Sequence, residues 1–128
     1  MCVEFEGRAT FVLVYLEEAH PIDGWMFDAV VHKVTQHTNS KERHDAARVL
    51  QRELHAAIAA AQREALADAT VTMPNILVDS MANLASATFG ALPERLVLLV
   101  GGDVVFLGGK GPEDYSVAEC KAALAALC

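Results

Sequence analysis

The stretch ERLVLLVGGDVVFLGGKGPEDYSVAECKAAL, residues 94–124, decides the fold. It opens with two apolar runs, residues 94–100 and 103–108, which have the length of β-strands. Gly101 and Gly102 separate them, and a two-residue Gly-Gly connection is typical of a tight hairpin turn. The stretch therefore predicts an antiparallel β-hairpin.

A helix is predicted after this hairpin. The segment GKGPEDYS reads as a loop, and Ser116 at its end is a good N-cap residue. Glu119 stands three positions later, where it completes a capping box. The apolar face of the helix comprises Val117, Ala118, Leu124 and Leu127.

Upstream, residues 11–16 (FVLVYL) read as a buried strand. A long helix is predicted over residues 40–67, with Asn39 as its cap and Glu42 at the capping-box position. Apolar residues at steps of three and four give this helix one buried stripe. The stripe comprises Ala47, Leu50, Leu54, Ala57, Ile58, Ala61 and Ala65.

Between the long helix and the hairpin, residues 75–79 form a predicted short strand. Asp79 or Ser80 is expected to cap a second helix, which Gly90 ends. Alternation of strands and helices predicts an α/β sheet whose early strands are parallel. A hairpin followed by a helix is the second half of a thioredoxin-type sandwich. The length of 128 residues fits one small domain, so we expect a single domain over residues 1–128.

Composition narrows the class of protein. The chain has 128 residues, is 53% hydrophobic and 21% charged, and carries a net charge of −7. These values are typical of a globular domain, and the scattered Lys and Arg argue against a nucleic-acid surface. No apolar run approaches the ~20 residues of a membrane span, and no signal peptide is expected. The three cysteines form no CxxC motif. We therefore expect reduced, intracellular thiols. We expect no metal site either.

The stretch VYLEEAHPIDGW, residues 14–25, is the most unusual part of the chain. An apolar strand ends there on two carboxylates and a histidine, with a tryptophan just beyond. A solvated turn would explain the polar residues. It would not explain Trp25.

Three segments in the same order resemble the iodothyronine deiodinases. FVLVYLEEAHPIDGW resembles the family's strand that ends in E-E-A-H before D-G-W. QHTNSKERHDAARVL resembles the next block, a Q-H pair before a helix. ILVDSMANLASATFGALPERLVLLVGGDVVFLGGKGPEDYSVAECKAAL resembles the C-terminal half. The likeness covers about residues 11–127, apart from an Ala-rich stretch around residues 56–70.

The resemblance implies a thioredoxin-like fold and the reductive removal of iodide from iodothyronines. The family's nucleophile is a selenocysteine or a cysteine that follows a first strand, upstream of the segment that resembles E-E-A-H. This sequence lacks a matching segment, so we expect a fold truncated at its N-terminus, without the nucleophile strand and most of the following helix. An in-frame UGA or cysteine codon upstream of Met1 would support this interpretation.

The resemblance also implies roles for three candidate catalytic residues. His20 would contact the phenol and relay a proton, since a histidine titrates near neutral pH. Glu18 would polarise that network, and His37 matches a second family histidine. Taken alone, a histidine after a strand is more often a solvated turn residue.

Three further residues are implied in substrate binding. Arg95 would clamp the far end of the thyronine, its carboxylate, by a forked contact. Trp25 and Phe27 would flank the aromatic rings. Without the resemblance, Arg95 reads as a strand residue that faces solvent or pairs with Glu94, and Trp25 reads equally well as core.

No cofactor is implied beyond an external thiol reductant. The expected partners are that thiol and an iodinated aromatic small molecule, and a homodimer is allowed by the family. Many members are anchored to membranes through an N-terminal segment. A cis Leu92–Pro93 bond is predicted, because thioredoxin-fold proteins often hold a cis proline before this strand.

Two other functions fit the same fold. A redoxin or thiol peroxidase needs a peroxidatic cysteine and a small substrate, which the E-E-A-H and E-R-L segments disfavour. A non-catalytic module that binds aromatic ligands or a protein needs no reactive thiol near the site.

Overall fold

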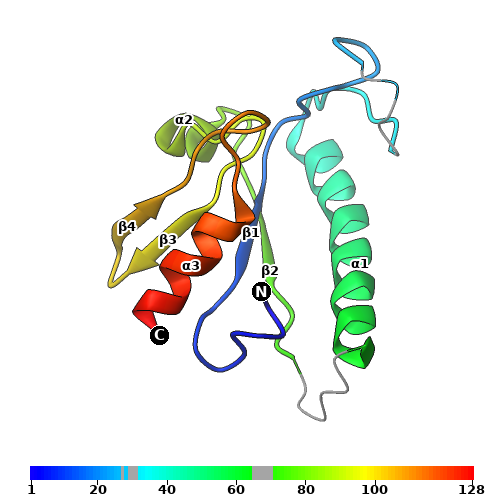
Figure 1. The fold of residues 1–128 in the computed structure, drawn as a ribbon. Helices are drawn as coiled ribbons and strands as arrows, with labels where there is room; N and C mark the ends of the chain where they lie inside the picture. The colour runs from blue at the N-terminus through cyan, green and yellow to red at the C-terminus, as the bar shows by residue number, and fades with distance from the viewer. Residues whose placement is uncertain (27, 29–31, 65–70) are drawn as a thin grey trace. The chain divides into compact units, whose positions relative to one another are not determined.

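A computed structural model describes residues 1–26, 28, 32–64 and 71–128. Within these ranges strands and helices follow one another in the predicted order, which confirms the α/β fold class (Figure 1). The elements are β1 (Val12–Tyr15), α1 (Ser40–Glu64), β2 (Asn75–Val78), α2 (Leu84–Phe89), β3 (Val97–Val100), β4 (Asp103–Leu107) and α3 (Val117–Leu127).

The chain divides into two compact units. The first unit comprises Met1–Tyr15 and His37–Val78, and the second comprises Leu16–Gln36 and Asp79–Cys128. The described strands divide in the same way, into a two-stranded sheet of β1 and β2 and a two-stranded sheet of β3 and β4.

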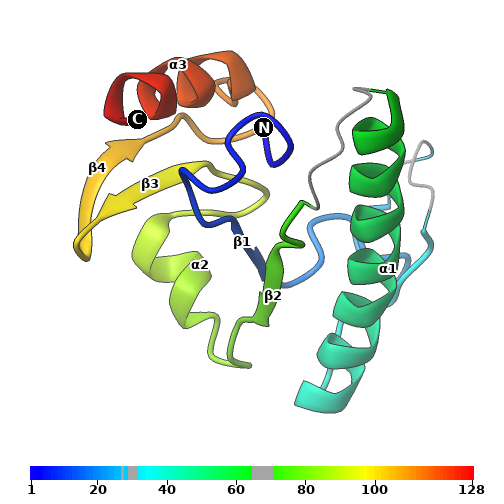
Figure 2. The ribbon, with the colours of Figure 1, turned by 90° about the horizontal axis from the view of Figure 1, so that it is seen from below.

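The sheet of the first unit is parallel, as predicted. β1 and β2 lie side by side (Figure 2). Val12 pairs with Asn75, and the register continues to Tyr15 opposite Val78. α1 packs against β2 and supplies part of the apolar core. The buried apolar residues of this unit are Phe5, Ala47, Ile58 and Val71.

The prediction that the first strand is buried was wrong at alternate positions. Val12 is 52% exposed and Val14 is 39% exposed, and Leu77 on the neighbouring strand is 56% exposed. Successive side chains of a strand point to opposite faces. One face of this small sheet therefore remains open to solvent.

The start of α1 has the predicted Asn39 cap, whereas the Glu42 carboxylate binds Thr38 and not the capping residue itself. The Asn39 side-chain oxygen accepts a hydrogen bond from the Glu42 backbone N–H at 3.0 Å. The Glu42 carboxylate reaches back to Thr38, one residue before the cap, and accepts from its backbone N–H and its hydroxyl at 2.8 and 3.0 Å. The bond to Asn39 satisfies one donor that the first turn of a helix leaves without an intrahelical partner, and the bonds to Thr38 fix the chain just before the cap.

The apolar stripe of α1 is confirmed in part. Its inward-facing members are buried or half-buried, namely Ala47, Leu50, Leu54 and Ile58. Ala57 and Ala61 are exposed, because a two-stranded sheet is too narrow to cover a wider helical face. Ala65 and the predicted helix end at residues 65–67 lie outside the described residues.

In the second unit, β3 and β4 form the predicted antiparallel hairpin. Gly101 and Gly102 make its turn with φ of 61° and 97°, in the left-handed region that glycine adopts at no steric cost. α3 packs against β3 (Figure 2). Cys120 and Leu124 are the buried residues of this helix. Ser116 caps α3 by accepting from the Glu119 N–H at 3.2 Å, as predicted.

α2 starts later than predicted, although the predicted residues do cap it. The N-cap position is Asn83, in the left-handed conformation at φ 54°. The Asp79 carboxylate nevertheless accepts from the N–H groups of Ala85 and Ser86, both at 2.9 Å. The Ser80 hydroxyl accepts from the Leu84 N–H at 3.3 Å.

Two further predictions in this region are confirmed. α2 ends at Gly90, which has φ 55°. The Leu92–Pro93 peptide bond is cis, and the Gly111–Pro112 bond is cis as well.

Candidate functional site

His20 and Trp25 contact each other in the loop 16–36 of the second unit. His20 Nδ1 lies 3.1 Å from the Trp25 carbonyl oxygen. The two rings meet in a T-shaped arrangement with centroids 5.1 Å apart. Trp25 is 78% exposed, so the interpretation of this residue as core was wrong. A short polar turn lets the indole stand out from the surface, where it offers an aromatic face beside an imidazole.

Glu18 is held in this loop through its backbone. Its N–H donates to Gln36 Oε1 at 3.2 Å, and its carbonyl accepts from Gln36 Nε2 at 2.9 Å. The Gln36 N–H in turn donates to the Asp23 carboxylate at 2.8 Å. The sequence does not predict this role of Gln36, because one amide that bridges two ends of a loop leaves no periodic signal.

A side-chain hydrogen bond joins the loop to the residue that begins α2. Asn83 Nδ2 donates to the Glu17 carboxylate at 2.8 Å. Taken alone, Glu17 is a polar residue at the end of a strand. Its carboxylate instead fixes the part of the loop that leads into His20.

The Arg95 guanidinium binds two backbone carbonyls, which neither of the two interpretations of this residue as a lone strand residue predicted. Its Nε donates to the Gly108 carbonyl at 2.9 Å, and its Nη1 donates to the Phe89 carbonyl at 2.7 Å. Side-chain atoms at position 90 would approach Nη1 closely, and Gly90 leaves that space open. The guanidinium therefore links the end of α2 to the end of β4.

His37 belongs to the first unit, whereas His20, Glu18, Trp25 and Arg95 belong to the second. His37 is only 7% exposed, and its ring centroid lies 5.7 Å from that of Tyr15. It precedes the capped start of α1, where hydrogen bonds from the Thr38 N–H and hydroxyl lower the pKa of the Glu42 carboxyl. Phe27 lies outside the described residues.

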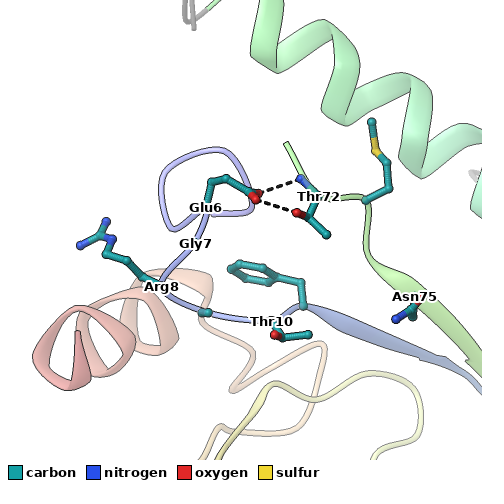
Figure 3. A pocket seen from close by; sticks show the side chains of 9 residues that line it. Glu6, Gly7, Arg8, Thr10, Thr72 and Asn75 are labelled. Carbon is teal, nitrogen blue, oxygen red and sulfur yellow. Dashed lines mark hydrogen bonds between the residues drawn. The ribbon is translucent and has the colours of Figure 1, made fainter. Parts of the chain in front are cut away.

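A hollow of about 250 Å³ lies in the first unit and contains none of the predicted site residues (Figure 3). The Glu6 carboxylate closes one side by accepting from the Thr72 hydroxyl and N–H at 2.6 and 2.8 Å, and these bonds lower the pKa of Glu6. The Arg8 side chain points away from Thr72. The lining residues are Glu6, Gly7, Arg8, Ala9, Thr10, Phe11, Thr72, Met73 and Asn75.

Two of the three thiols are poor nucleophiles. None of the three cysteines forms a disulfide, and burial raises the pKa values of Cys2 and Cys120. A raised pKa disfavours the thiolate, which is the reactive form. Cys120 is 3% exposed on α3, and Cys128 is exposed at the end of the chain.

Among the described residues, no group of three or more His, Cys, Asp or Glu side chains is arranged so that it could hold a metal ion. No helix among them has the length and apolar character to cross a bilayer.

The chain is similar to known proteins over nearly its whole length. A family model described as iodothyronine deiodinase matches residues 1–127. Thyroxine 5-deiodinases from Sus scrofa, Homo sapiens and Gallus gallus are 31%, 32% and 33% identical to it over 121 residues, or 94% of the chain. Those 121 residues are 34% of the Sus scrofa and Homo sapiens proteins and 40% of the Gallus gallus protein. The chain therefore spans little more than a third of the length of these curated relatives. It belongs to the iodothyronine deiodinase family.

Proposed function

We propose that the chain is the phenol-binding and carboxylate-binding part of a thyroxine deiodinase-like oxidoreductase. The substrate would be an iodinated aromatic of the thyroid-hormone type. The observation that carries the proposal is the pair of His20 and the exposed Trp25 in a chain that belongs to this family. The relatives' own name, thyroxine 5-deiodinase, supplies the substrate class.

The reaction requires a nucleophile and two equivalents of thiol. A selenolate or thiolate attacks iodine, the carbon–iodine bond breaks, and the aryl carbon takes up a proton. The resulting selenenyl or sulfenyl iodide reacts with one external thiolate, releases iodide and forms a mixed disulfide or selenosulfide. A second thiolate regenerates the nucleophile and leaves the reductant as its disulfide.

The nucleophile belongs to a part of the protein that this chain does not span. The raised pKa values of Cys2 and Cys120 support this assignment. With no thiolate of its own at the site, the chain contributes groups that bind and orient substrate. An external thiol is the reductant, and assembly as a homodimer is compatible with this division of labour.

His20 is the group assigned to the phenolic oxygen. An imidazole titrates near neutral pH, so it can exchange a proton with a phenol without a large energetic mismatch. Trp25 offers an aromatic surface next to it, and stacked or T-shaped aromatic contacts favour an iodinated ring. Glu18 is assigned to polarising the same proton network, and a role for His37 stays a prediction of the family resemblance.

Arg95 is assigned to the substrate carboxylate. A guanidinium carries five N–H donors in a planar fork. Two of them are used on the carbonyls of Gly108 and Phe89, which fix the plane of the group. The remaining donors on Nη1 and Nη2 suffice for a forked contact with a carboxylate.

The test uses the longest open reading frame that contains these residues, with cysteine at any in-frame UGA. Iodide release from thyroxine in the presence of a dithiol is measured for the wild type, His20→Ala and Arg95→Lys. We expect His20→Ala to lower kcat/KM by about 100-fold or more. Arg95→Lys should mainly raise KM. Peroxide turnover without iodide release would replace the proposal with a thiol peroxidase. Loss of both activities in a folded wild-type protein would replace it with a non-catalytic module.

A further inference from the structure

The Gln36 side chain binds both main-chain groups of one residue in the loop that carries His20. Its Oε1 accepts from the Glu18 N–H at 3.2 Å, and its Nε2 donates to the Glu18 carbonyl at 2.9 Å. The pairing of β1 with β2 ends at Tyr15, opposite Val78. Beyond that point a side-chain amide gives the Glu18 main chain the two hydrogen bonds that a residue of an antiparallel neighbouring strand would give it.

Gln36 also holds the chain on the other side of His20. Its own N–H donates to the Asp23 carboxylate at 2.8 Å. Next to this bond, the Ile22 N–H donates to the Val34 carbonyl at 2.9 Å. Gln36 is therefore hydrogen-bonded to the chain both before and after His20, once through its side chain and once through its main chain.

The arc of residues 18–23, which Gln36 holds at both ends, is also restricted from within. Pro21 follows His20 directly and is buried. A proline fixes its own φ and disfavours the α region for the residue before it. The place of the imidazole therefore follows from the place of its main chain, and the ring lies in T-shaped contact with Trp25 at a centroid distance of 5.1 Å.

We propose that Gln36 is a positioning residue for the removal of iodide, because its two-sided hold on the arc sets where the His20 imidazole lies against the phenolic hydroxyl of the substrate. This inference rests on the proposed function, in which His20 contacts the phenol. Gln36 acts through His20 and touches no reacting atom. Such a role has a measurable size, since a displacement of about 1 Å can lower a rate by about 100-fold.

A purely structural role for Gln36 is the alternative. Hydrogen bonds that close a loop also stabilise it, so a less stable variant is expected in both cases. The two roles differ in whether the effect of Gln36 on the reaction passes through His20. Substitutions with independent effects multiply, whereas substitutions that act through one group do not.

The first experiment measures the place of His20 in the labelled chain by NMR. The Trp25 indole should shift the ring-proton resonances of His20 relative to Trp25→Ala, because the two rings are in contact. Gln36→Met removes both side-chain hydrogen bonds at similar length and volume. It should reduce this shift, and the Glu18 amide hydrogen should exchange with solvent about tenfold faster, as expected for one lost hydrogen bond.

Gln51→Met, the same change on α1 in the first unit, is the matched control and should alter neither quantity. Gln36→Glu is the second variant. It keeps an oxygen for the Glu18 N–H but turns a second acceptor toward the Glu18 carbonyl, so it should also reduce the shift of the His20 resonances. An unchanged shift in both variants of Gln36 would overturn the inference whatever the function of the protein.

The second experiment is a double-mutant cycle in the longest open reading frame, with iodide release from thyroxine as the readout. Gln36→Met should lower kcat/KM by about tenfold or more when His20 is present. In His20→Ala it should lower kcat/KM by less than about twofold, since the displaced group is then absent. Equal factors in the two backgrounds would overturn the positioning role.

The outcomes also separate this inference from the proposed function. Wild-type activity of His20→Ala would overturn the proposed function and with it the link between Gln36 and the reaction. The NMR shift would in that case still show whether Gln36 places His20 beside Trp25. A smaller shift in Gln36→Met, together with a loss of activity that depends on His20, supports both.

Discussion

Glu17 and Asn83, 66 positions apart in the sequence, meet side chain to side chain at 2.8 Å. The bond joins the loop that carries His20 to the residue that begins α2. Asn83 also adopts the left-handed conformation, φ 54°, which asparagine tolerates better than most residues other than glycine.

The two roles of Asn83 can be separated by substitution. Asn83→Ala removes the hydrogen bond and adds backbone strain, so it should lower the free energy of unfolding by about 2–3 kcal/mol. Asn83→Gly also removes the hydrogen bond to Glu17 but adds no backbone strain, so it should cost about 1 kcal/mol. Guanidinium unfolding of both variants checks this. An equal loss for the two variants would contradict the contribution of backbone strain.

Asp79 should be one of the most sensitive positions for stability. It is 7% exposed, and its carboxylate accepts from the N–H groups of Ser80, Ala85 and Ser86. Asp79→Ala leaves these donors without their acceptor and should cost about 2–3 kcal/mol. Asp79→Asn keeps one acceptor oxygen and should cost about half as much. The measurement is again equilibrium unfolding, and a neutral Asp79→Ala would contradict the capping role.

Arg95 combines a structural and a proposed functional role. Arg95→Lys keeps the charge but cannot span the carbonyls of Phe89 and Gly108 with a planar fork. We expect a loss of about 1–2 kcal/mol in the free energy of unfolding, in addition to weaker substrate binding. An unchanged stability would mean that these two hydrogen bonds contribute nothing to the fold.

The carboxylate of Glu42 should make the first unit sensitive to acid. Hydrogen bonds from the Thr38 backbone and hydroxyl lower the pKa of Glu42 in the folded state. A lowered folded pKa means that the stabilisation is present above the unfolded value, about 4.3, and is lost as pH falls through the folded value. The difference in stability between the wild type and Glu42→Gln should therefore shrink below about pH 4. Glu113→Gln, an exposed loop substitution, is the control, and a difference for Glu42→Gln that is independent of pH would contradict the prediction.

Local signals in the sequence predicted local structure well. The Gly101-Gly102 turn, the Asn39 and Ser116 caps and the Gly90 stop each depend on a few neighbouring residues, and all are present. The partners of Arg95 and Glu17 were not predictable in this way. A backbone carbonyl looks the same at every residue, so no pattern marks Phe89 or Gly108 as acceptors for Arg95.

Solvent exposure was the other property that the residue types predicted wrongly. Trp25, Val12 and Val14 are all apolar, and each reads as core on its own, yet all three are exposed. Burial depends on how many helices and strands pack around a residue. A short segment of sequence does not encode that number. The candidate site was accessible to prediction only through its resemblance to a family, because His20 and Arg95 have ordinary alternatives as single residues.

The open face of β1 and β2 has a consequence for handling the protein. Within the residues that the structure describes, this sheet has two strands, so β1 and β2 are both edge strands, and they carry the exposed side chains of Val12, Val14 and Leu77. Such edges recruit strands from other molecules. Concentrated solutions of the chain should scatter light increasingly with time, and Val14→Lys should delay that self-association.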